Sequence, residues 1–205
     1  EKGFNGIAGI VHACNRIANI YLDLRKPQAA LLYLDTALSF AKRQNAPALI
    51  AGIYNNMGDA YMQQKGFAKA IQLYRYSLNY AEQADDMTAL TNALNGIGEA
   101  LITAPDASLR EADITLAQRF VMARSYLQRS LKISENTDGF FLNQRLSLKW
   151  LSSLCEKEQH YEEALQYLHQ YTDMQDTIIN SDKAKAIIAQ QIRSETQQKE
   201  QRIEE

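Results

Sequence analysis

The sequence repeats itself at an interval of about 40 residues, and this periodicity restricts the fold more than any other feature of the chain. The first halves of the units align as Ile17, Ala18 and Tyr21, then Met57, Gly58 and Tyr61, then Ile97, Gly98 and Leu101, then Leu148, Leu151, Ser152 and Cys155. The second halves align as Ala30, Leu34 and Ala37, then Ala70, Tyr74 and Ser77, then Ala123, Leu127 and Ser130, then Ala164, Leu168 and Tyr171. Repetition at this interval is typical of arrays in which one supersecondary unit stacks on the next.

Each unit has the pattern of two helices joined by a turn. Apolar residues recur at spacings of three, four and seven, which places them on one face of a helix. Gly and Pro are scarce, with 9 and 3 residues in a chain of 205, so little in the sequence breaks helices. A single hairpin leaves apolar surface exposed, so we expect the hairpins to stack in series. Small residues are expected to face each other across the hairpins: Ala18, Gly58 and Gly98 on one helix, and Ala30, Ala70 and Ala123 on the other.

The second unit carries a family resemblance. Its Tyr54, Met57, Gly58 and Tyr61, followed by Ala70, Tyr74 and Ser77, are spaced as in the tetratricopeptide repeat, which the sequence resembles over residues 11–176. The resemblance implies an all-α, right-handed superhelical solenoid of about four hairpins. The repeats would lie near residues 11–44, 51–84, 91–137 and 145–178, in an array that spans 1–176. Departures from the pattern occur at Leu101, Ser152 and Cys155.

Two segments fall outside the repeat pattern. Residues 102–122 form an insertion in the third unit, which either a lengthened hairpin or a projecting lid or docking element would explain. Residues 177–205 are expected to form a long C-terminal helix that caps the array or links it to a following segment. The apolar residues before position 193 favour capping, whereas residues 193–205 are rich in Gln, Glu and Lys and favour an exposed linker.

Charge and hydropathy argue against two roles for these residues. The 22 basic and 24 acidic side chains give a net charge of −2, so there is no basic surplus to neutralise nucleic-acid phosphates. Mean hydropathy is −0.38, and no stretch of about 20 residues is apolar enough to span a bilayer. The sequence begins at Glu1 without an initiator Met, so we expect a piece of a longer chain that meets a membrane only through segments outside it.

The sequence lacks motifs for catalysis, metal binding or cofactor binding. Gly96 and Gly98 lack the third glycine of a dinucleotide-binding fingerprint and fall within a predicted helix. The three histidines do not have metal-binding spacing. Cys14 and Cys155 occupy apolar repeat positions, where cysteine acts as a small hydrophobic residue. We therefore expect these 205 residues to be non-enzymatic, with no catalytic residue, metal or cofactor, while a kinase domain outside them stays open.

The first helix of each tetratricopeptide hairpin lines the concave face of the solenoid, and three asparagines occupy equivalent positions there. They are Asn15, Asn55 and Asn95. An asparagine amide offers both a donor and an acceptor, which matches the N–H and C=O groups of an extended peptide. The predicted peptide-binding groove comprises His12, Asn15, Asn19, Asn55, Asp59, Gln63, Asn92, Asn95 and Glu99. The alternatives are that these side chains are only solvated, or that they bond one another between repeats.

The resemblance also implies a biological role. A tetratricopeptide array that ends in a charged helix, here residues 171–205, is similar to the extracytoplasmic sensor region of membrane-anchored bacterial regulators. Those proteins carry a histidine-kinase or DNA-binding output domain. A periplasmic location, a protein or peptide ligand in the groove and a homodimer formed through the C-terminal helix would follow. Two other hypotheses stay open: a cytoplasmic scaffold without signalling output, and a fragment of an enzyme whose catalytic part lies elsewhere.

Overall fold

The computed structural model describes residues 2–176, and within this part of the chain every regular element is a helix. The helices are α1 (Lys2–Asp23), α2 (Pro27–Arg43), α3 (Pro47–Gln63), α4 (Phe67–Gln83), α5 (Met87–Thr103), α6 (Asp106–Glu111), α7 (Leu116–Glu135) and α8 (Phe141–Lys157). Residues 161–176 are also helical. The expected helix at 177–205 lies outside the described residues, and so does the homodimer attributed to it.

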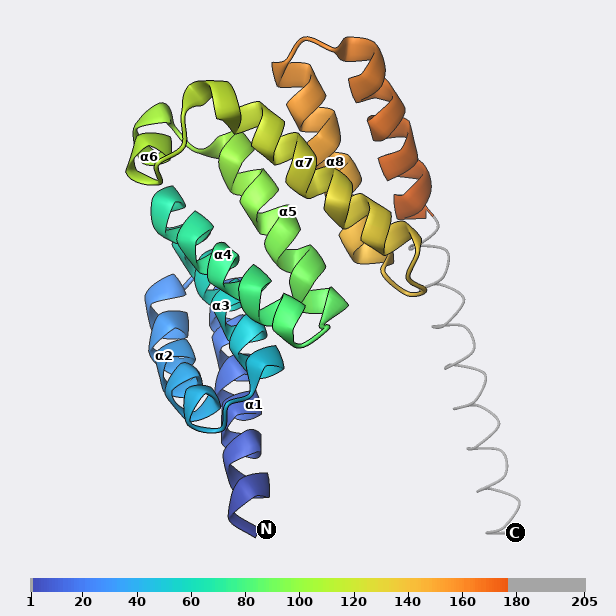
Figure 1. Ribbon diagram of the computed structural model, residues 1–205. Coiled ribbons are helices and arrows are strands. Elements are labelled where there is room, and N and C mark those ends of the chain that lie inside the picture. The colour runs from blue at the N-terminus through green and yellow to red at the C-terminus, as the bar shows by residue number, and fades with distance from the viewer. Residues whose placement is uncertain (1, 177–205) are drawn as a thin grey trace, which may run out of the picture.

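The helices pair into antiparallel hairpins that stack in series (Figure 1). α1 pairs with α2, α3 with α4 and α5 with α7, while α8 runs beside the helical residues 161–176. The first helices of successive hairpins also touch: α1 contacts α3, α3 contacts α5 and α5 contacts α8. We call these four helices the inner layer, and the second helices of the hairpins the outer layer. The predicted fold class, an all-α solenoid of helical hairpins, is confirmed.

Local sequence determines where several helices begin. Pro27 and Pro47 occupy the first turns of α2 and α3. Backbone N–H groups in a first turn have no acceptor within the helix, so proline, which lacks this group, costs no hydrogen bond there. The side chain of Asp86 caps α5 by accepting a hydrogen bond from the backbone N–H three residues later. Thr115 and Gln118 form a reciprocal capping box at the start of α7. These caps satisfy helix ends that would otherwise expose free donors.

Six of the described helices end in the same kind of chain reversal. A residue with φ between 50° and 64° follows the helix in each case: Arg25, Asn45, Lys65, Asp85, Asp113 and Gln159. The next backbone N–H bonds back to the carbonyl five positions earlier, as in the 2.8 Å bond from Gly66 to Tyr61.

The contacts of the small repeat residues differ from those expected. A side chain at Gly58 would meet the ring of Tyr74, and one at Gly98 would meet Leu127, rather than the alanines at positions 70 and 123. Both alanines are fully buried, but the contacting residue lies one helical turn after each of them. Helical side chains lean toward the N-terminus, so a large residue one turn later reaches back over the same spot.

The insertion in the third unit packs against the array. Leu109 and Ile114 from this segment are buried in the same core cluster as α5 and α7. Arg119 donates three hydrogen bonds of 2.6 to 2.9 Å to backbone carbonyls at and just after the end of α5. Residues 102–122 therefore form the packed connection of a lengthened hairpin, with α6 against α4, and they do not form a projecting lid.

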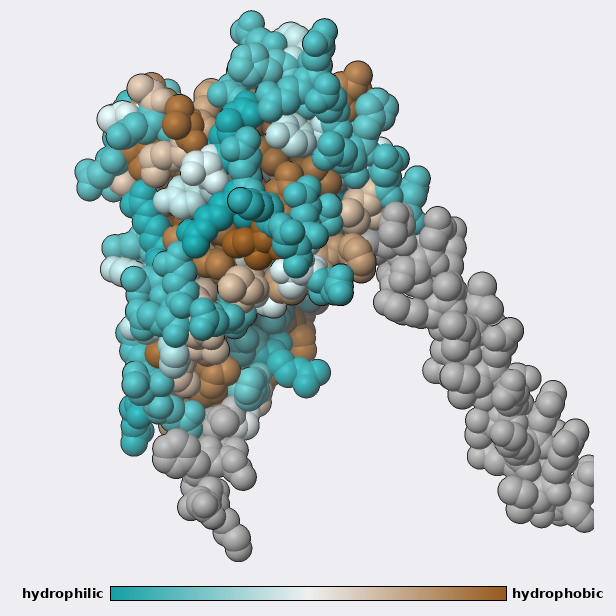
Figure 2. All heavy atoms as spheres, turned by 45° about the vertical axis from the view of Figure 1, so that its right-hand side comes forward, coloured by the Kyte–Doolittle hydropathy of each residue, from teal (hydrophilic) through white to brown (hydrophobic). Residues whose placement is uncertain are grey.

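The visible surface of the array is mainly hydrophilic. On the face shown in Figure 2, apolar patches are small and are separated by hydrophilic side chains. Throughout residues 2–176, no helix is both long enough and apolar enough to cross a bilayer. The apolar side chains are instead concentrated between the two helix layers.

Candidate ligand-binding groove

Two adjoining depressions open on the inner layer of the array. The wide depression has a volume of about 730 Å³ and lies along the C-terminal halves of α1, α3 and α5. The narrow depression has a volume of about 200 Å³ and lies between α3, α5 and α8. Asn56, Asp59 and Glu99 border both depressions. We therefore treat them as one feature, the inner groove.

Seven of the nine residues predicted to bind a ligand border the inner groove. Asn19 and Gln63 line the wide depression, Asn55, Asn92 and Asn95 line the narrow one, and Asp59 and Glu99 line both. His12 and Asn15 line neither depression. The structure thus brings together most of a set chosen from repeat positions alone, and ligand binding by these residues stays a prediction.

The three equivalent asparagines hold neighbouring repeats together. Asn15 Oδ1 accepts a 2.8 Å hydrogen bond from Asn56 of α3. Asn55 Nδ2 donates to a backbone carbonyl of α5 at 2.9 Å, and Asn95 Nδ2 donates to a backbone carbonyl of α8 at 3.2 Å. Each bond crosses from one inner helix to the next. These contacts show bonding between repeats, one of the two alternatives to peptide binding. They occupy the Nδ2 donors of Asn55 and Asn95 and the Oδ1 acceptor of Asn15.

Tyr74 reaches the inner groove from the outer layer through a gap between two glycines. A Cβ atom at Gly58 would lie 2.4 Å from the Tyr74 ring, and one at Gly96 would lie 2.6 Å from it. The absence of both Cβ atoms lets the ring pass between α3 and α5, where its hydroxyl donates a 2.6 Å hydrogen bond to Asp59 Oδ1. Sequence reasoning missed this role; the available signal was a tyrosine where the other units have leucine.

The carboxyl groups at the centre of the groove both have raised pKa values. The Asp59 side chain is exposed toward the groove, but protein atoms surround its other sides. The resulting loss of water raises the pKa of Asp59, and the hydrogen bond from Tyr74 offsets this rise only in part. Burial also raises the pKa of Glu99, the charge of Asp59 adds to the rise, and Lys149 opposes it. Burial, followed by the charge of Asp59, holds the pKa of Tyr74 well above its ordinary value. The groove centre therefore holds two poorly compensated acidic groups.

Two further acceptors beside the groove have no hydrogen-bond donor within the described chain. Asn55 is 5% exposed, and its Oδ1 atom is buried without a partner. Gln63 donates to the carbonyl of Leu22 at 3.0 Å, but its Oε1 atom is also buried without a partner. A buried polar atom left unpaired costs about 1–3 kcal/mol. Such atoms mark positions at which a ligand that supplies N–H groups would be stabilised.

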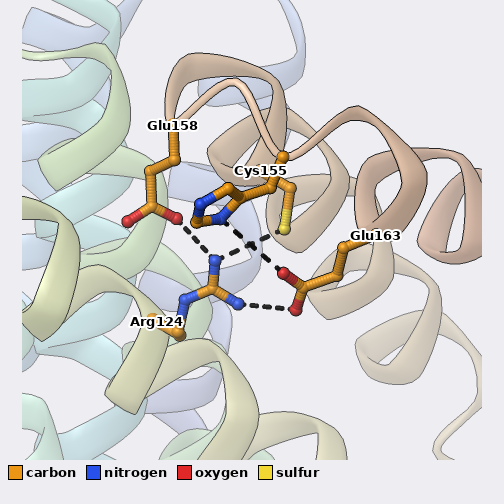
Figure 3. Close-up of polar contacts among 5 residues, drawn as sticks. Arg124, Cys155, Glu158 and Glu163 are labelled. Atoms are coloured by element: carbon orange, nitrogen blue, oxygen red, sulfur yellow. Dashed lines mark hydrogen bonds and ion pairs between the residues drawn. The ribbon is translucent and has the colours of Figure 1, made fainter.

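A second polar cluster joins the third and fourth hairpins (Figure 3). Arg124 of α7 donates to Glu158 after α8 and, at 2.7 Å, to Glu163, and its Nη2 lies 3.5 Å from Cys155 Sγ. Partial burial lowers the pKa of Arg124, but the two carboxylates outweigh burial and raise it. Burial raises the pKa of the Cys155 thiol despite the opposing effect of Arg124, so the thiol stays protonated at neutral pH and is a poor nucleophile. The contacts are those of a clamp between hairpins.

Another depression, with a volume of about 530 Å³, lies between α4 and α6. Its lining includes cations and anions: Lys65, Lys69, Arg75, Glu111 and Asp113. None of the unpartnered buried polar atoms of the described chain borders it. The inner groove, which has two such atoms at its walls, is therefore the better candidate for a binding site. In the same residues, no group of three or more His, Cys, Asp and Glu side chains is placed to hold a metal ion.

Comparison with known families finds a similarity in the first two hairpins. The tetratricopeptide repeat family model matches residues 11–44 and 51–83, which cover most of α1 with α2, and α3 with α4. These two segments are similar to tetratricopeptide repeats, and together they make up about a third of the 205-residue chain. No curated protein matches the sequence. Tetratricopeptide repeats indicate a module for interaction with a protein or peptide, and the later hairpins continue the same stacking.

Proposed function

We propose that the chain is a non-enzymatic module that binds an extended peptide or protein segment in the inner groove. The observation that carries the proposal is the pair of buried acceptors without donors, Asn55 Oδ1 and Gln63 Oε1, in the groove walls. An extended segment presents backbone N–H groups at regular intervals, and acceptors of this kind bind them. The tetratricopeptide repeats support the same class of partner.

Selection from a random library of short linear peptides tests this function without a known partner. The full 205-residue chain is the target, and bound peptides are retested against a variant whose wide depression is blocked by Asn19→Trp and Thr103→Trp. Both positions are exposed at the groove, so a large ring fills it without entering the core. Ser39→Trp with Ser125→Trp, at exposed positions of α2 and α7, is the matched control.

We expect the selected peptides to bind the original chain and the control, and to lose at least about tenfold in affinity for the blocked variant. Circular dichroism establishes that both variants keep their helical content. If the library yields no binder, or if the blocked variant binds as well as the control does, the groove is not the binding site.

The biological setting that we propose is the sensory region of a membrane-anchored bacterial regulator, with the array in the periplasm. The support is the resemblance of the array and the charged segment at residues 171–205 to such sensor regions. Ligand binding in the groove would then shift an exit helix between two arrangements. A cytoplasmic scaffold without signalling output is the alternative.

The coding sequence that follows Glu205 in the native gene distinguishes the two settings. An apolar segment of about 20 residues, followed by a histidine-kinase or DNA-binding domain, is expected for the regulator. Protease added to intact spheroplasts should then digest the array. A native protein without such a segment, in which the array resists protease until the cells are lysed, would identify the scaffold instead.

A further inference from the structure

We propose that the inner groove binds a lysine or arginine side chain of its partner, with the cationic group held between Asp59 and Glu99. This inference rests on the proposed function and adds to it the chemistry of the ligand. Both carboxyl groups border the narrow depression, one from α3 and the other from α5, at positions 40 residues apart in the repeat.

The residues that line the narrow depression carry a negative charge, and Lys149 of α8 offsets part of the charge of Glu99. The lining contains these two acidic residues and no Lys, Arg or His. Asp59 and Glu99 form no ion pair within the described residues, whereas other acidic groups such as Glu82 and Glu158 do. The charge of Asp59 disfavours ionisation of Glu99 and adds to its raised pKa, whereas loss of water raises the pKa of Asp59. A cation placed between them removes that repulsion and gains attraction to both.

The hydrogen-bonding groups of the narrow depression also fit a cation. Asn55 borders it, is nine-tenths buried, and keeps Oδ1 without a donor. Together with the Asp59 and Glu99 carboxylates, this oxygen makes three acceptor groups. An ammonium group has three N–H donors and a guanidinium has five, and neither has an acceptor. A carboxylate or phosphate ligand would bring only acceptors, so the groove disfavours it in both charge and hydrogen bonding.

The apolar walls of the narrow depression suit the rest of a basic side chain. Leu146 and Trp150 of α8 line it opposite the inner helices α3 and α5. The methylene stem of lysine or arginine packs on apolar surface while its charged end is held elsewhere, and an indole face attracts a cation. Lys149 already places its ammonium 4.7 Å from the Trp150 ring centroid, which shows that this ring accepts a positive neighbour.

The test compares blocked tetra-alanine peptides that carry one central Lys, Arg, norleucine or Glu residue. Norleucine keeps the lysine stem and removes the charge. Binding to the full chain is followed by NMR through the Trp150 indole and the side-chain amides of Asn55 and Asn95, which lie at the narrow depression. The variant is Asp59→Asn with Glu99→Gln, in which the amide at position 59 can still accept from Tyr74. Its matched control is Asp35→Asn with Glu135→Gln, two exposed acids of the outer layer.

We expect the Lys and Arg peptides to give saturable shifts at these resonances, and the norleucine and Glu peptides to bind at least about tenfold more weakly. Added salt should lower the affinity of the chain for the Lys peptide but not its affinity for the norleucine peptide. The groove variant should bind the Lys peptide no better than it binds the norleucine peptide, while the control keeps the original affinity. The comparison of the four peptides on the unaltered chain requires no variant, so it stands even if the groove variant does not fold.

Failure of the cation inference is distinct from failure of the proposed function. Equal affinity for Lys, norleucine and Glu peptides, or library-selected groove binders without basic residues, would overturn the inference while leaving peptide binding intact. A library that yields no groove binder, together with no shift by any of the four peptides, would overturn both.

Discussion

Tyr74 of α4 donates a 2.6 Å hydrogen bond to Asp59 of α3 and so connects the outer layer of the array to its groove. The connection depends on the close passage of the ring between Gly58 and Gly96. Tyr74 is 3% exposed, so its hydroxyl has little contact with water and depends on Asp59 for a partner. One buried side chain therefore contributes both to core packing and to the electrostatics of the site.

The close passage of Tyr74 makes Gly58 intolerant of a side chain. Gly58→Ala places a Cβ atom 2.4 Å from the ring, so the ring or a helix must move, and we expect a loss of about 1–3 kcal/mol in the free energy of unfolding. Gly58→Leu should cost at least as much. Gly52→Ala in the same helix is the control, because nothing lies within 4 Å of its Cβ position and alanine favours a helix by up to about 1 kcal/mol. Urea denaturation of the three variants measures the difference, and equal stability would contradict the packing.

The Tyr74 hydroxyl lowers the pKa of Asp59, and its removal should be detectable. Tyr74→Phe keeps the ring in place and deletes the donor, so we expect the unfolding free energy to fall by about 1 kcal/mol. The pKa of Asp59 should rise further, because the one effect that lowers it is lost. NMR titration of the Asp59 carboxyl group measures this shift. Tyr33→Phe serves as the control, since the Tyr33 ring stacks on Tyr21 without a hydroxyl bond in the described chain.

The raised pKa of Glu99 predicts that replacing this acid by neutral glutamine stabilises the fold, by an amount that depends on pH. Between the ordinary pKa of glutamate and the raised value, the folded protein binds more protons than the unfolded chain, so stability falls as pH rises. Glu99→Gln should therefore be more stable than the original chain at neutral pH, and the advantage should disappear below the ordinary pKa. Thermal denaturation across this pH range gives the comparison. Glu135→Gln, at an exposed position, should not show the same dependence.

The Arg124 clamp should stabilise the last hairpin more than an exposed ion pair does. Arg124→Met leaves Glu158 and Glu163 without their donor. Because water reaches these three side chains only in part and screens their charges weakly, we expect the free energy of unfolding to fall by about 1–2 kcal/mol. Arg129 and Glu82 form a more exposed pair across the outer layer, so Arg129→Met should cost no more than about 0.5 kcal/mol. Hydrogen exchange localises the effect: amides of α8 should exchange faster in the first variant only. Equal losses in both variants would rule out the clamp.

Repetition in the sequence was enough to predict the helices and their order of stacking, because apolar spacing and turn residues act within one hairpin. Seven of the nine residues that it selected border the inner groove, although other residues line the groove as well. It did not show that Asn55 and Asn95 use their donors on the next inner helix, since that contact depends on how far apart two hairpins lie. The path of Tyr74 was equally hidden, because it requires glycines from two different repeats on either side of one ring.

The amide of Asn55 sets the spacing of two repeats with one atom and borders the groove with the other. Its Nδ2 donates to the backbone of α5, while its Oδ1 has no donor within the described residues. The hydrogen bond from this amide is one of the contacts that join α3 to α5. If the inner groove binds a segment as we propose, a guest that reaches this oxygen would act on the same amide that bonds α3 to α5, and occupancy would then bear on the pitch of the superhelix.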